Sequence, residues 1–378
     1  MKYLSKAKPK ELGGTALLRL DFNTEDEWRM EASLPTVRFL IKHAAKVVIV
    51  SHRGRPEGYD KKLSLEHDAK RLSRYLHKPV HFIASTHFAD ISMAVARASR
   101  RSVLLLENLR FWPGEDTNDD GFAHSLAGLA SYYVNDAFAV SHRTAASVVA
   151  VTEHLPSYVG LGLESELEHL AHLSEHPKKP FVVVLGGGKA HDKLGVIQFF
   201  RRRADWFLLG GAAANTVLKL RGVNVKKSKI DTDAHDAPFL QSASHDKHVL
   251  TPVDWKIKRG AILDIGPKTA KLFAEKIKTA KTILWSGPMG FIEDAKFRKG
   301  NLAIAKAVAA NRASFSVTGG GETVMFLKRY KLDRKFSFIS TGGGAMLDFL
   351  AGEALPGITA LKGRPSLRPT GQKVLKRK

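Results

Sequence analysis

The sequence of 378 residues contains no cysteine. It can therefore form no disulfide bond, no thiolate metal site and no cysteine nucleophile, and it suits a reducing compartment such as the cytoplasm. It also has no apolar run approaching the roughly 20 residues that a membrane-spanning helix needs. Residues 1–14 carry no apolar segment of the secretory kind, so we expect neither a signal peptide nor a membrane partner.

Acidic residues are scarce relative to basic ones. The chain has 37 Asp and Glu against 60 Lys and Arg, a formal net charge of +23. Such a charge attracts anions, which include phosphorylated small molecules, nucleic acid and anionic lipid. Residues 362–378 hold seven Lys or Arg and no acid, and we interpret them as a disordered basic tail. Nucleic-acid contact through this tail would be non-specific and salt-sensitive, and we favour the alternative of a solubilising tail or a proteome-wide charge bias.

Short apolar runs alternate with helical segments along the chain, and the length suggests two domains. A helix is expected over 34–45, with Pro35 in its first turn. This alternation predicts an α/β protein with two open, mostly parallel sheets. The expected strands are 15–22, 46–52, 81–83, 103–109 and 132–138 in the first half, and 181–185, 206–209, 262–265, 282–285, 315–318 and 336–340 in the second.

A helical segment over 164–176 separates the two halves, and Pro177 and Pro180 end it. We interpret it as an interdomain helix because it carries no loop chemistry. The predicted organisation is an N-terminal domain over 1–158, a hinge helix over 159–178, a C-terminal domain over 179–350 and a segment over 351–378 that returns toward the N-terminal domain before the tail.

In the first half, charged residues follow the expected strands. Parallel sheets bind ligands beyond the carboxyl ends of their strands, so these residues should gather at one edge. Arginine forks bind carboxylates and phosphates in a bidentate manner, and the set predicts a basic bowl for an anionic substrate. Its members are Asp21, Asn23, Arg29 in the loop after Asp21, His52, Arg55, Arg110, His142 and Arg143.

In the second half, glycine-rich turns follow the strands instead. The turn after 181–185 reads GGGK, with Lys189 at its end and Lys193 in the next helical turn. It is not a Walker A loop, because Ala190 stands where a hydroxyl would hold magnesium. Such turns bring backbone N–H groups close to phosphate, and together they predict a nucleotide platform. The turns are 186–188, 210–211, 287–290, 319–321 and 342–344.

An anion bowl in one half and a nucleotide platform in the other suit phosphoryl transfer, which needs positioning and charge neutralisation more than covalent chemistry. Many segments, in order, also match one family. From about Thr15 to Leu361 the chain resembles phosphoglycerate kinase, through the motifs DFN (21–23), SHRGRPEG (51–58), LLLENLRF (104–111), LGGGKAHDK (185–193), LGGAAANTVL (209–218), ILWSGPMGFIE (283–293), GGGET (319–323) and STGGGA (340–345).

The resemblance implies two Rossmann-like, doubly wound domains joined by a hinge helix. It implies a monomeric cytoplasmic enzyme of glycolysis that transfers a phosphoryl group between ATP and 3-phosphoglycerate, forming 1,3-bisphosphoglycerate and ADP, with Mg²⁺ or alternatively Mn²⁺ bound to the nucleotide. Domain closure and electrostatic stabilisation would drive the transfer.

The resemblance also implies residue roles. Arg29, Lys189 and Gly343 would be catalytic, and Glu322 would help to hold the metal. The phosphoglycerate would contact Asp21, Asn23, Arg29, His52, Arg55, Arg110 and Arg143. The nucleotide would contact Gly187, Lys193, Gly211, Glu293, Gly320, Gly321, Glu322, Thr323, Gly342 and Gly344.

The sequence departs from the family pattern at four places. Glu322 replaces an Asp, Ser286 replaces the Asn of WNGP, Ala145 replaces a second histidine, and the loop from Asn23 to Arg29 is short. None removes a principal charge, so we expect an active enzyme with altered metal or nucleotide preference. The alternative is a binding protein that keeps the fold, lacks efficient catalysis and binds nucleic acid.

Overall fold

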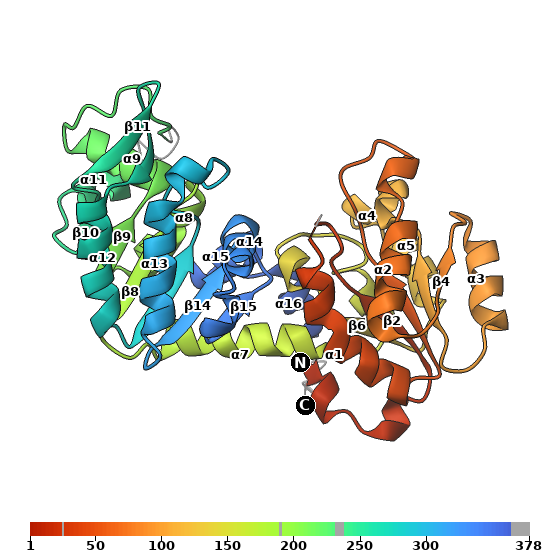
Figure 1. Ribbon diagram of the computed structural model, residues 1–378. Coiled ribbons are helices and arrows are strands. Elements are labelled where there is room, and N and C mark those ends of the chain that lie inside the picture. The colour runs from red at the N-terminus through yellow and green to blue at the C-terminus, as the bar shows by residue number, and fades with distance from the viewer. Residues whose placement is uncertain (25, 189–190, 231–237, 364–378) are drawn as a thin grey trace, which may run out of the picture. The chain divides into compact units, whose positions relative to one another are not determined.

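The computed structural model describes residues 1–24, 26–188, 191–230 and 238–363. These residues form two compact units (Figure 1). Unit 1 comprises 1–163 and 355–363, and unit 2 comprises 164–354. No helix in the described part of the chain is both long enough and apolar enough to cross a bilayer. The predicted basic tail lies outside the described residues from 364 onward.

Unit 1 is built on a parallel sheet, for which the described residues give seven strands in the order β1-β7-β6-β2-β3-β5-β4. Five of these strands follow the sequence prediction. The other two, β1 and β7, lie at one edge and are too short to produce a recognisable apolar pattern. The strands are β1 (Lys2–Tyr3), β2 (Thr15–Arg19), β3 (Lys46–Val50), β4 (Val80–Ile83), β5 (Val103–Leu106), β6 (Tyr132–Asn135) and β7 (Ser157–Val159).

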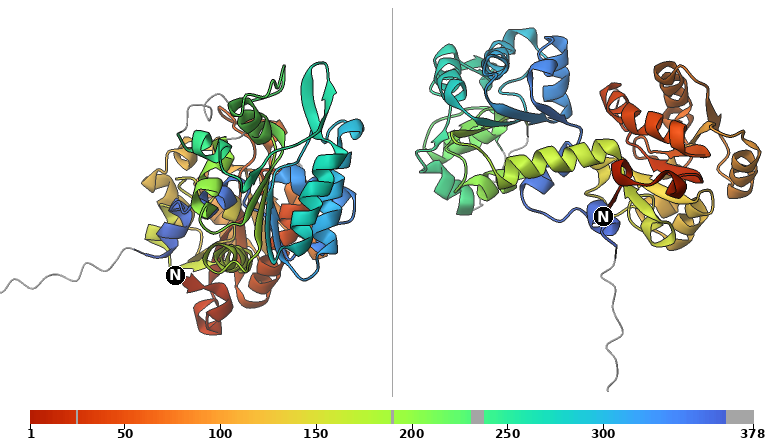
Figure 2. Two further views of the ribbon diagram at one scale, coloured as in Figure 1. Left: turned by 90° about the vertical axis from the view of Figure 1, so that its left-hand side faces the viewer. Right: turned by 90° about the horizontal axis from the view of Figure 1, so that it is seen from below.

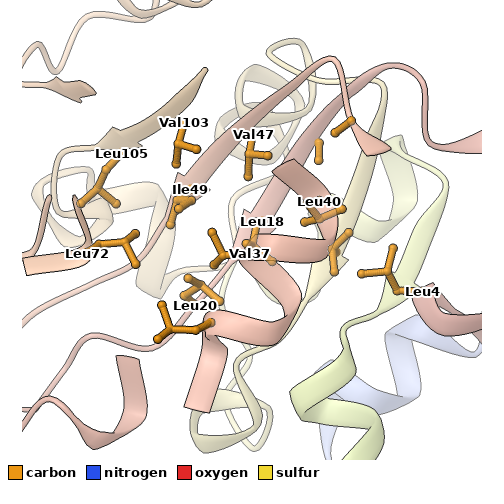
Figure 3. Packing of buried hydrophobic residues seen from close by; sticks show 14 of the residues in the cluster. Leu4, Leu18, Leu20, Val37, Leu40, Val47, Ile49, Leu72, Val103 and Leu105 are labelled. Carbon is orange, nitrogen blue, oxygen red and sulfur yellow. The ribbon is translucent and has the colours of Figure 1, made fainter. Parts of the chain in front are cut away.

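Helices cover this sheet and bury its apolar face. Leu18 of β2 is paired with Ile49 of β3, and Ile49 with Leu105 of β5, so the three side chains share one face. Figure 3 shows them packed with Val37 and Leu40 of helix α1 in the same buried cluster. The helices of unit 1 are α1 (Trp28–His43), α2 (Glu66–Leu76), α3 (Phe88–Arg97), α4 (Pro113–Asp116), α5 (Asp120–Ala127), α6 (Val151–His154) and α16 (Pro356–Leu361).

The predicted start of the first helix was wrong. α1 begins at Trp28, six residues before Leu34, and Pro35 lies inside it rather than in its first turn. A proline inside a helix removes one backbone N–H bond, and the hydroxyl of Ser33 donates to the carbonyl of Met30 (2.8 Å) in the same stretch. The earlier start places Arg29 in the first turn of α1 and not in a loop.

Unit 2 contains a second parallel sheet, of six strands within the described residues, in the order β10-β9-β8-β13-β14-β15. Figure 2 shows helices on both of its faces. Along β8, Val182 and Val184 belong to the core that includes Phe273 of α12, whereas Phe181 packs edge-on against Phe200 of α8. This two-sided burial explains the unbroken apolar runs in the sequence.

Apart from the two-residue strand β10, which was not predicted, the strands and helices of this sheet follow one another in the βα rhythm that the sequence predicts. Its strands are β8 (Phe181–Leu185), β9 (Trp206–Leu209), β10 (Val249–Leu250), β13 (Thr282–Ser286), β14 (Phe315–Gly319) and β15 (Phe338–Ser340). Its helices are α8 (His191–Phe200), α9 (Gly211–Leu220), α11 (Pro238–Ser244), α12 (Pro267–Thr279), α13 (Lys299–Ala310), α14 (Gly321–Arg329) and α15 (Gly344–Leu350).

The segment 262–265 was wrongly assigned to this parallel sheet. It belongs to β12 (Ala261–Ile265), which pairs antiparallel with β11 (Trp255–Lys258) as a separate two-stranded sheet. Arg259 and Gly260, between the two strands, both have positive φ (53° and 80°), which is typical of a tight hairpin turn. A short apolar run alone cannot distinguish the two kinds of strand.

Helix α7 (Leu161–Glu175) begins in unit 1 and continues into unit 2. In unit 1, the backbone N–H of Leu163 donates to Oδ1 of Asp136 (2.8 Å), and the N–H of Leu161 donates to the hydroxyl of Thr36 (3.0 Å). Burial raises the pKa of Asp136 to about 6. The first turn of α7 is therefore held by two side chains from outside the helix.

Candidate active site

In unit 1, seven of the eight predicted bowl residues, all except His142, lie together at the carboxyl edge of the sheet. The guanidiniums of Arg29, Arg110 and Arg143 all act electrostatically on His52, and Arg143 is in turn close to Arg55, Arg110 and Asp21. The segments that follow four strands supply these side chains, with Arg29 coming from the first turn of α1 and the others from loops and turns. We call the set Asp21, Asn23, Arg29, His52, Arg55, Arg110 and Arg143 the arginine bowl.

Two residues that follow β2 organise one side of the bowl. Oδ2 of Asp21 accepts a hydrogen bond from Nη1 of Arg29 (2.7 Å), and Oδ1 accepts the backbone N–H of Asn23. The amide oxygen of Asn23 accepts the backbone N–H of Gly54 (2.8 Å). The short loop therefore leaves Arg29 within reach of the bowl, and Asp21 fixes its direction.

Arg110 is fixed by a second set of contacts. It lies in the 3₁₀ turn Leu109–Phe111, where Nη1 donates to the carbonyl of Gly54 and Nε donates to Oδ1 of Asp116 (3.1 Å). Gly54 has a φ of 62°, and a Cβ there would lie 2.8 Å from a methyl group of Leu63. Only glycine fits this turn without strain.

The bowl offers hydrogen-bond donors far more than acceptors. Burial, with the neighbouring charges of Arg19 and the bowl arginines, holds the pKa of His52 well below its ordinary value. Burial together with Arg110 and Arg55 also lowers the pKa of Arg143. Arg55 is exposed at the rim. A ligand that bears several anionic oxygens would satisfy these donors.

Sequence reasoning missed the residues that support the bowl from beneath. Arg19, Glu115 and Ser147 are almost completely buried and lie behind His52. Asn108 accepts the N–H groups of Arg53 (3.0 Å) and Arg110 (3.1 Å). The signal for Arg19 was an arginine inside an otherwise apolar strand, TALLR, because a charge on a buried strand needs partners.

At one departure from the family pattern, the chain has replaced a polar group by packing. Ala145, which stands where a second histidine was expected from the resemblance, is buried in an apolar cluster with Ala137, Val140 and Val148. The cluster lies beside the loop that carries Arg143. The alanine therefore contributes to the packing of this loop and brings no charge to the bowl.

In unit 2, a cavity of about 290 Å³ opens at the carboxyl ends of β8 and β9. Four predicted nucleotide residues line it, namely Gly187, Gly211, Glu293 and Glu322. Its other walls are largely apolar. We call it the glycine cavity, and its further lining includes Ala212, Asn215, Lys229, Ile262, Leu263, Asp264, Pro288, Met289 and Phe291.

The floor of the glycine cavity consists of closely packed backbone. Gly211, which begins α9, has a φ of 56°, and a Cβ on it would collide with the backbone of Gly187. Gly187 itself has a φ of 90°, and its N–H donates to the carbonyl of Pro288 (2.7 Å). A flat ligand can therefore approach the chain directly on this side.

Among the described residues, the other predicted members of the nucleotide site in unit 2 are not part of the cavity lining. Lys189 lies outside the described residues. Lys193 is on α8, and the hydroxyl of Thr323 accepts the N–H of Gly287 (3.1 Å). Gly320 directly precedes α14 with a φ of 93°, and Gly343 directly precedes α15 with a φ of 54°. Gly321 and Gly344 begin these two helices, and Gly342 lies one residue before Gly343.

Two charged residues that line the cavity, Lys229 and Asp264, were not predicted. Burial raises the pKa of Asp264 to about 6, and its carboxylate accepts the N–H groups of Ile265 (3.0 Å) and Gly300 (2.9 Å). Lys229 is exposed, and its Nζ lies 3.3 Å from the position of a Cβ on Gly188. Asn215 donates to the carbonyl of Lys229 (3.0 Å) and fixes its backbone. Asp264 stands in the segment ILDIGPKT (262–269), which matches the family pattern, but no role was assigned to it, and no motif contains Lys229.

Most of the chain is similar to known kinases. The family model of phosphoglycerate kinase matches residues 12–353. The chain is 39% identical over 379 residues to the phosphoglycerate kinase of Dictyoglomus turgidum, covering 93% of this chain and 96% of that protein. It is 40% identical over 382 residues to that of Desulfosudis oleivorans, with the same coverage.

Solved structures agree with this result. The phosphoglycerate kinase of Coxiella burnetii superposes with a TM-score of 0.81 at 32% identity, covering 96% of this chain and 99% of that one. The enzyme of Pyrococcus horikoshii gives a TM-score of 0.83 at 31% identity, covering 96% and 98%.

Proposed function

Since this chain belongs to the phosphoglycerate kinase family and has phosphoglycerate kinase activity, we propose that its two units divide the reaction between them. Unit 1 binds 3-phosphoglycerate or 1,3-bisphosphoglycerate in the arginine bowl. Unit 2 binds ATP or ADP in the glycine cavity. By its resemblance to this glycolytic family, we expect the enzyme to act in the cytoplasm as a monomer.

The single observation that carries the substrate assignment is the gathering of guanidiniums around a neutral His52. Arginines at these positions bind carboxylate and phosphate oxygens as bidentate forks. At the side of the bowl, the carboxylate of Asp21 accepts from Arg29 and from the backbone of Asn23. The amide oxygen of Asn23 in turn accepts the backbone N–H of Gly54. A three-carbon phosphate with one carboxylate matches this distribution of charge.

The nucleotide assignment rests on the shape and lining of the glycine cavity. A purine fits between the glycine floor and the apolar side chains of Ile262, Leu263 and Phe291. Glu293 then accepts from the ribose hydroxyls. The phosphates extend toward Lys193, the start of α14 and the turn 342–344, where backbone N–H groups favour anions.

Phosphoryl transfer in this arrangement needs no general base. A carboxylate oxygen of 3-phosphoglycerate attacks the γ-phosphorus of ATP, the bond from that phosphorus to the bridging oxygen breaks, and ADP leaves. Arg29 and Lys189 stabilise the charge on the moving group by electrostatics, and the reaction requires the two ligand sites to approach each other so that water is excluded.

The available protein donors suit a magnesium ion that is bound mainly by the nucleotide phosphates. The described residues contain no cluster of three or more His, Cys, Asp or Glu suited to a metal, whereas Glu322 provides one carboxylate at the cavity. Mg²⁺ is commonly held by one or two carboxylates together with substrate phosphates. When bound, it neutralises phosphate charge. Because the side chain of Glu322 is longer than that of the expected Asp, the activity with Mn²⁺ should be compared with that with Mg²⁺.

Separate calorimetric titrations with 3-phosphoglycerate and Mg-ATP test the division of labour. We expect Arg143→Met to weaken binding of 3-phosphoglycerate at least tenfold and to leave ATP binding unchanged. Glu293→Gln should weaken ATP binding and leave 3-phosphoglycerate binding unchanged. The opposite pattern, in which either variant affects only the other ligand, would refute the assignment.

A further inference from the structure

Behind His52 lies a hydrogen-bonded set of buried polar side chains. Arg19 at the end of β2 is 1% exposed, Glu115 of α4 is 1% exposed, and Ser147 is fully buried. His52 is 2% exposed, yet its Nε2 has no hydrogen-bond partner among the described residues. A buried ring nitrogen without a partner calls for an explanation.

The donors and acceptors in this hydrogen-bonded set of side chains can be assigned from the distances between their polar atoms. Nε of Arg19 donates to the hydroxyl of Ser147 (2.8 Å), and that hydroxyl donates to Oε1 of Glu115 (2.6 Å). The backbone N–H of Ser147 donates to Oε2 of the same carboxylate (3.0 Å). Nη2 of Arg19 lies 3.0 Å from Nδ1 of His52. Every group in the set then has one consistent role.

The last contact determines the protonation of His52. A guanidinium has five N–H donors and no acceptor, so Nδ1 of His52 must accept from Arg19. A neutral imidazole that accepts at Nδ1 carries its proton on Nε2. That N–H is then the unpartnered group, and Arg29, Arg110 and Arg143 are the charged groups of the bowl near it.

We propose that Arg19 is a positioning residue that holds His52 as the neutral Nε2–H tautomer, so that the bowl presents a fixed N–H donor to an anionic oxygen of the ligand. Glu115, whose Oε1 is 3.8 Å from Nη2 of Arg19, balances the charge of Arg19 behind the site. This inference rests on the proposed binding of phosphoglycerate in the bowl only for the identity of the acceptor.

The arrangement also prevents His52 from taking a second proton. An added Nδ1–H would point at the N–H of Arg19, and the new charge would face Arg19 from β2, Arg29 from α1, Arg110 from its 3₁₀ turn and Arg143 from its loop. Asp21 is engaged with Arg29, and Glu115 lies beyond Arg19. The donor therefore persists unchanged across physiological pH.

Long-range ¹H–¹⁵N spectra of histidine-labelled full-length protein test the tautomer directly. The His52 signals, assigned by their loss in His52→Gln, should show the Nε2–H pattern at every pH from about 5.5 to 8.5, since an unperturbed histidine would titrate there. An Nδ1–H pattern, or an imidazolium pattern within that range, overturns the proposal without any need for a variant at Arg19.

Removing the donor separates positioning from stability. In Arg19→Met we expect His52 to titrate, and the KM for 3-phosphoglycerate to gain a pH dependence of roughly tenfold between pH 6 and 8, as loss of one charge-assisted hydrogen bond implies. Arg19→Lys should restore a flat profile. Arg97→Met, at an exposed arginine of α3, is the control. A folded Arg19→Met protein with an unchanged tautomer and a flat profile reduces Arg19 to a structural role.

Adding 3-phosphoglycerate distinguishes this inference from the proposed function. A shift of the His52 Nε2 resonance on titration supports the substrate contact. If the tautomer is Nε2–H and no shift occurs, the bowl assignment fails and the inference about Arg19 stands. If a shift occurs on an Nδ1–H ring, the bowl assignment stands and the inference about Arg19 fails.

Discussion

The two candidate sites of this molecule are built from opposite materials. In unit 1 the arginine bowl consists of long charged side chains, each held by partners such as Asp21 for Arg29 and Asp116 for Arg110. In unit 2 the floor of the glycine cavity consists of bare backbone, where a methyl group on Gly211 would already collide. One site depends on the groups that are present, and the other on the absence of side chains.

This contrast indicates how each site tolerates change. Removing a side chain from the bowl should lose charge and leave the fold intact, whereas adding one to the cavity should exclude the ligand. The variants below test that difference, beginning with the largest expected effect.

The largest effect is expected in the bowl. Arg29→Ala removes a charge proposed to stabilise the moving phosphoryl group, so kcat should fall roughly 10²- to 10³-fold. Arg38→Ala on the same helix is the matched control, because Arg38 donates to the carbonyl of Tyr75 (3.1 Å), away from the bowl. Steady-state kinetics in a coupled assay measures both. A kcat that falls equally in the two variants contradicts a specific role for Arg29.

A smaller effect is expected in the cavity. Gly211→Ala combines a strained φ with a collision against Gly187, and we expect the KM for ATP to rise about tenfold or more while the affinity for 3-phosphoglycerate holds. Gly222→Ala is the control, because Gly222 shares a positive φ (79°) but a Cβ added to it would meet no atom within 4 Å. If the KM for ATP rises equally in the two variants, backbone strain and not the collision with Gly187 accounts for the rise.

Among the described residues, burial raises the pKa of Asp136 in unit 1 and of Asp264 in unit 2 to about 6. An unfolded aspartic acid ionises near pH 3.9, so between about pH 4 and 6 the folded protein holds protons that the unfolded chain releases. The stability from these two groups is complete below about pH 4 and is lost as the pH rises through about 6.

Urea unfolding at pH 4.5 and 7 measures this loss. Asp136→Asn and Asp264→Asn should each reduce the fall in unfolding free energy between these pH values by roughly 1 to 2 kcal/mol. Because the amide oxygen still accepts from Leu163 in one unit and Gly300 in the other, the fold should persist. An unaltered pH dependence in both variants would rule out the raised pKa values.

The smallest effect concerns the one lysine at the cavity that sequence reasoning missed. Lys229→Met keeps the aliphatic stem and removes an exposed ammonium near Gly188, so we expect only a two- to fivefold rise in the KM for ATP, in line with a solvent-exposed charge. Lys227→Met, whose stem packs near Gly260, is the control. A larger effect in the control would place the important charge elsewhere.

The sequence predicted the fold well where runs were long and apolar. All the longer parallel strands were found, because burial on both faces leaves an unbroken pattern. The strands β1 and β7 are too short to give a recognisable apolar pattern. The apolar sequence of β12 is like that of a parallel strand, and only its antiparallel pairing with β11 distinguishes it. The start of α1 was missed because Pro35 is tolerated inside the helix.

The site was predicted unequally for the same physical reason. Bowl residues such as His52 and Arg143 stand after strands, and parallel topology brings them together. The groups that orient them, Arg19 and Asn108, come from inside the fold. Arg19 and His52 are 33 residues apart in the sequence, and no local spacing pattern predicts a contact over that separation. The roles of Lys189 and of the turn 342–344 stay predictions.

The buried chain of Arg19, Ser147 and Glu115 has a consequence for how this protein can evolve. Because the Ser147 hydroxyl accepts from one neighbour and donates to the other, losing any one member leaves a buried donor or acceptor without a partner. Substitutions that are harmful singly can then be accepted only in combination. Among related sequences, changes at these three positions should therefore occur together more often than singly, apart from conservative ones such as Arg19→Lys.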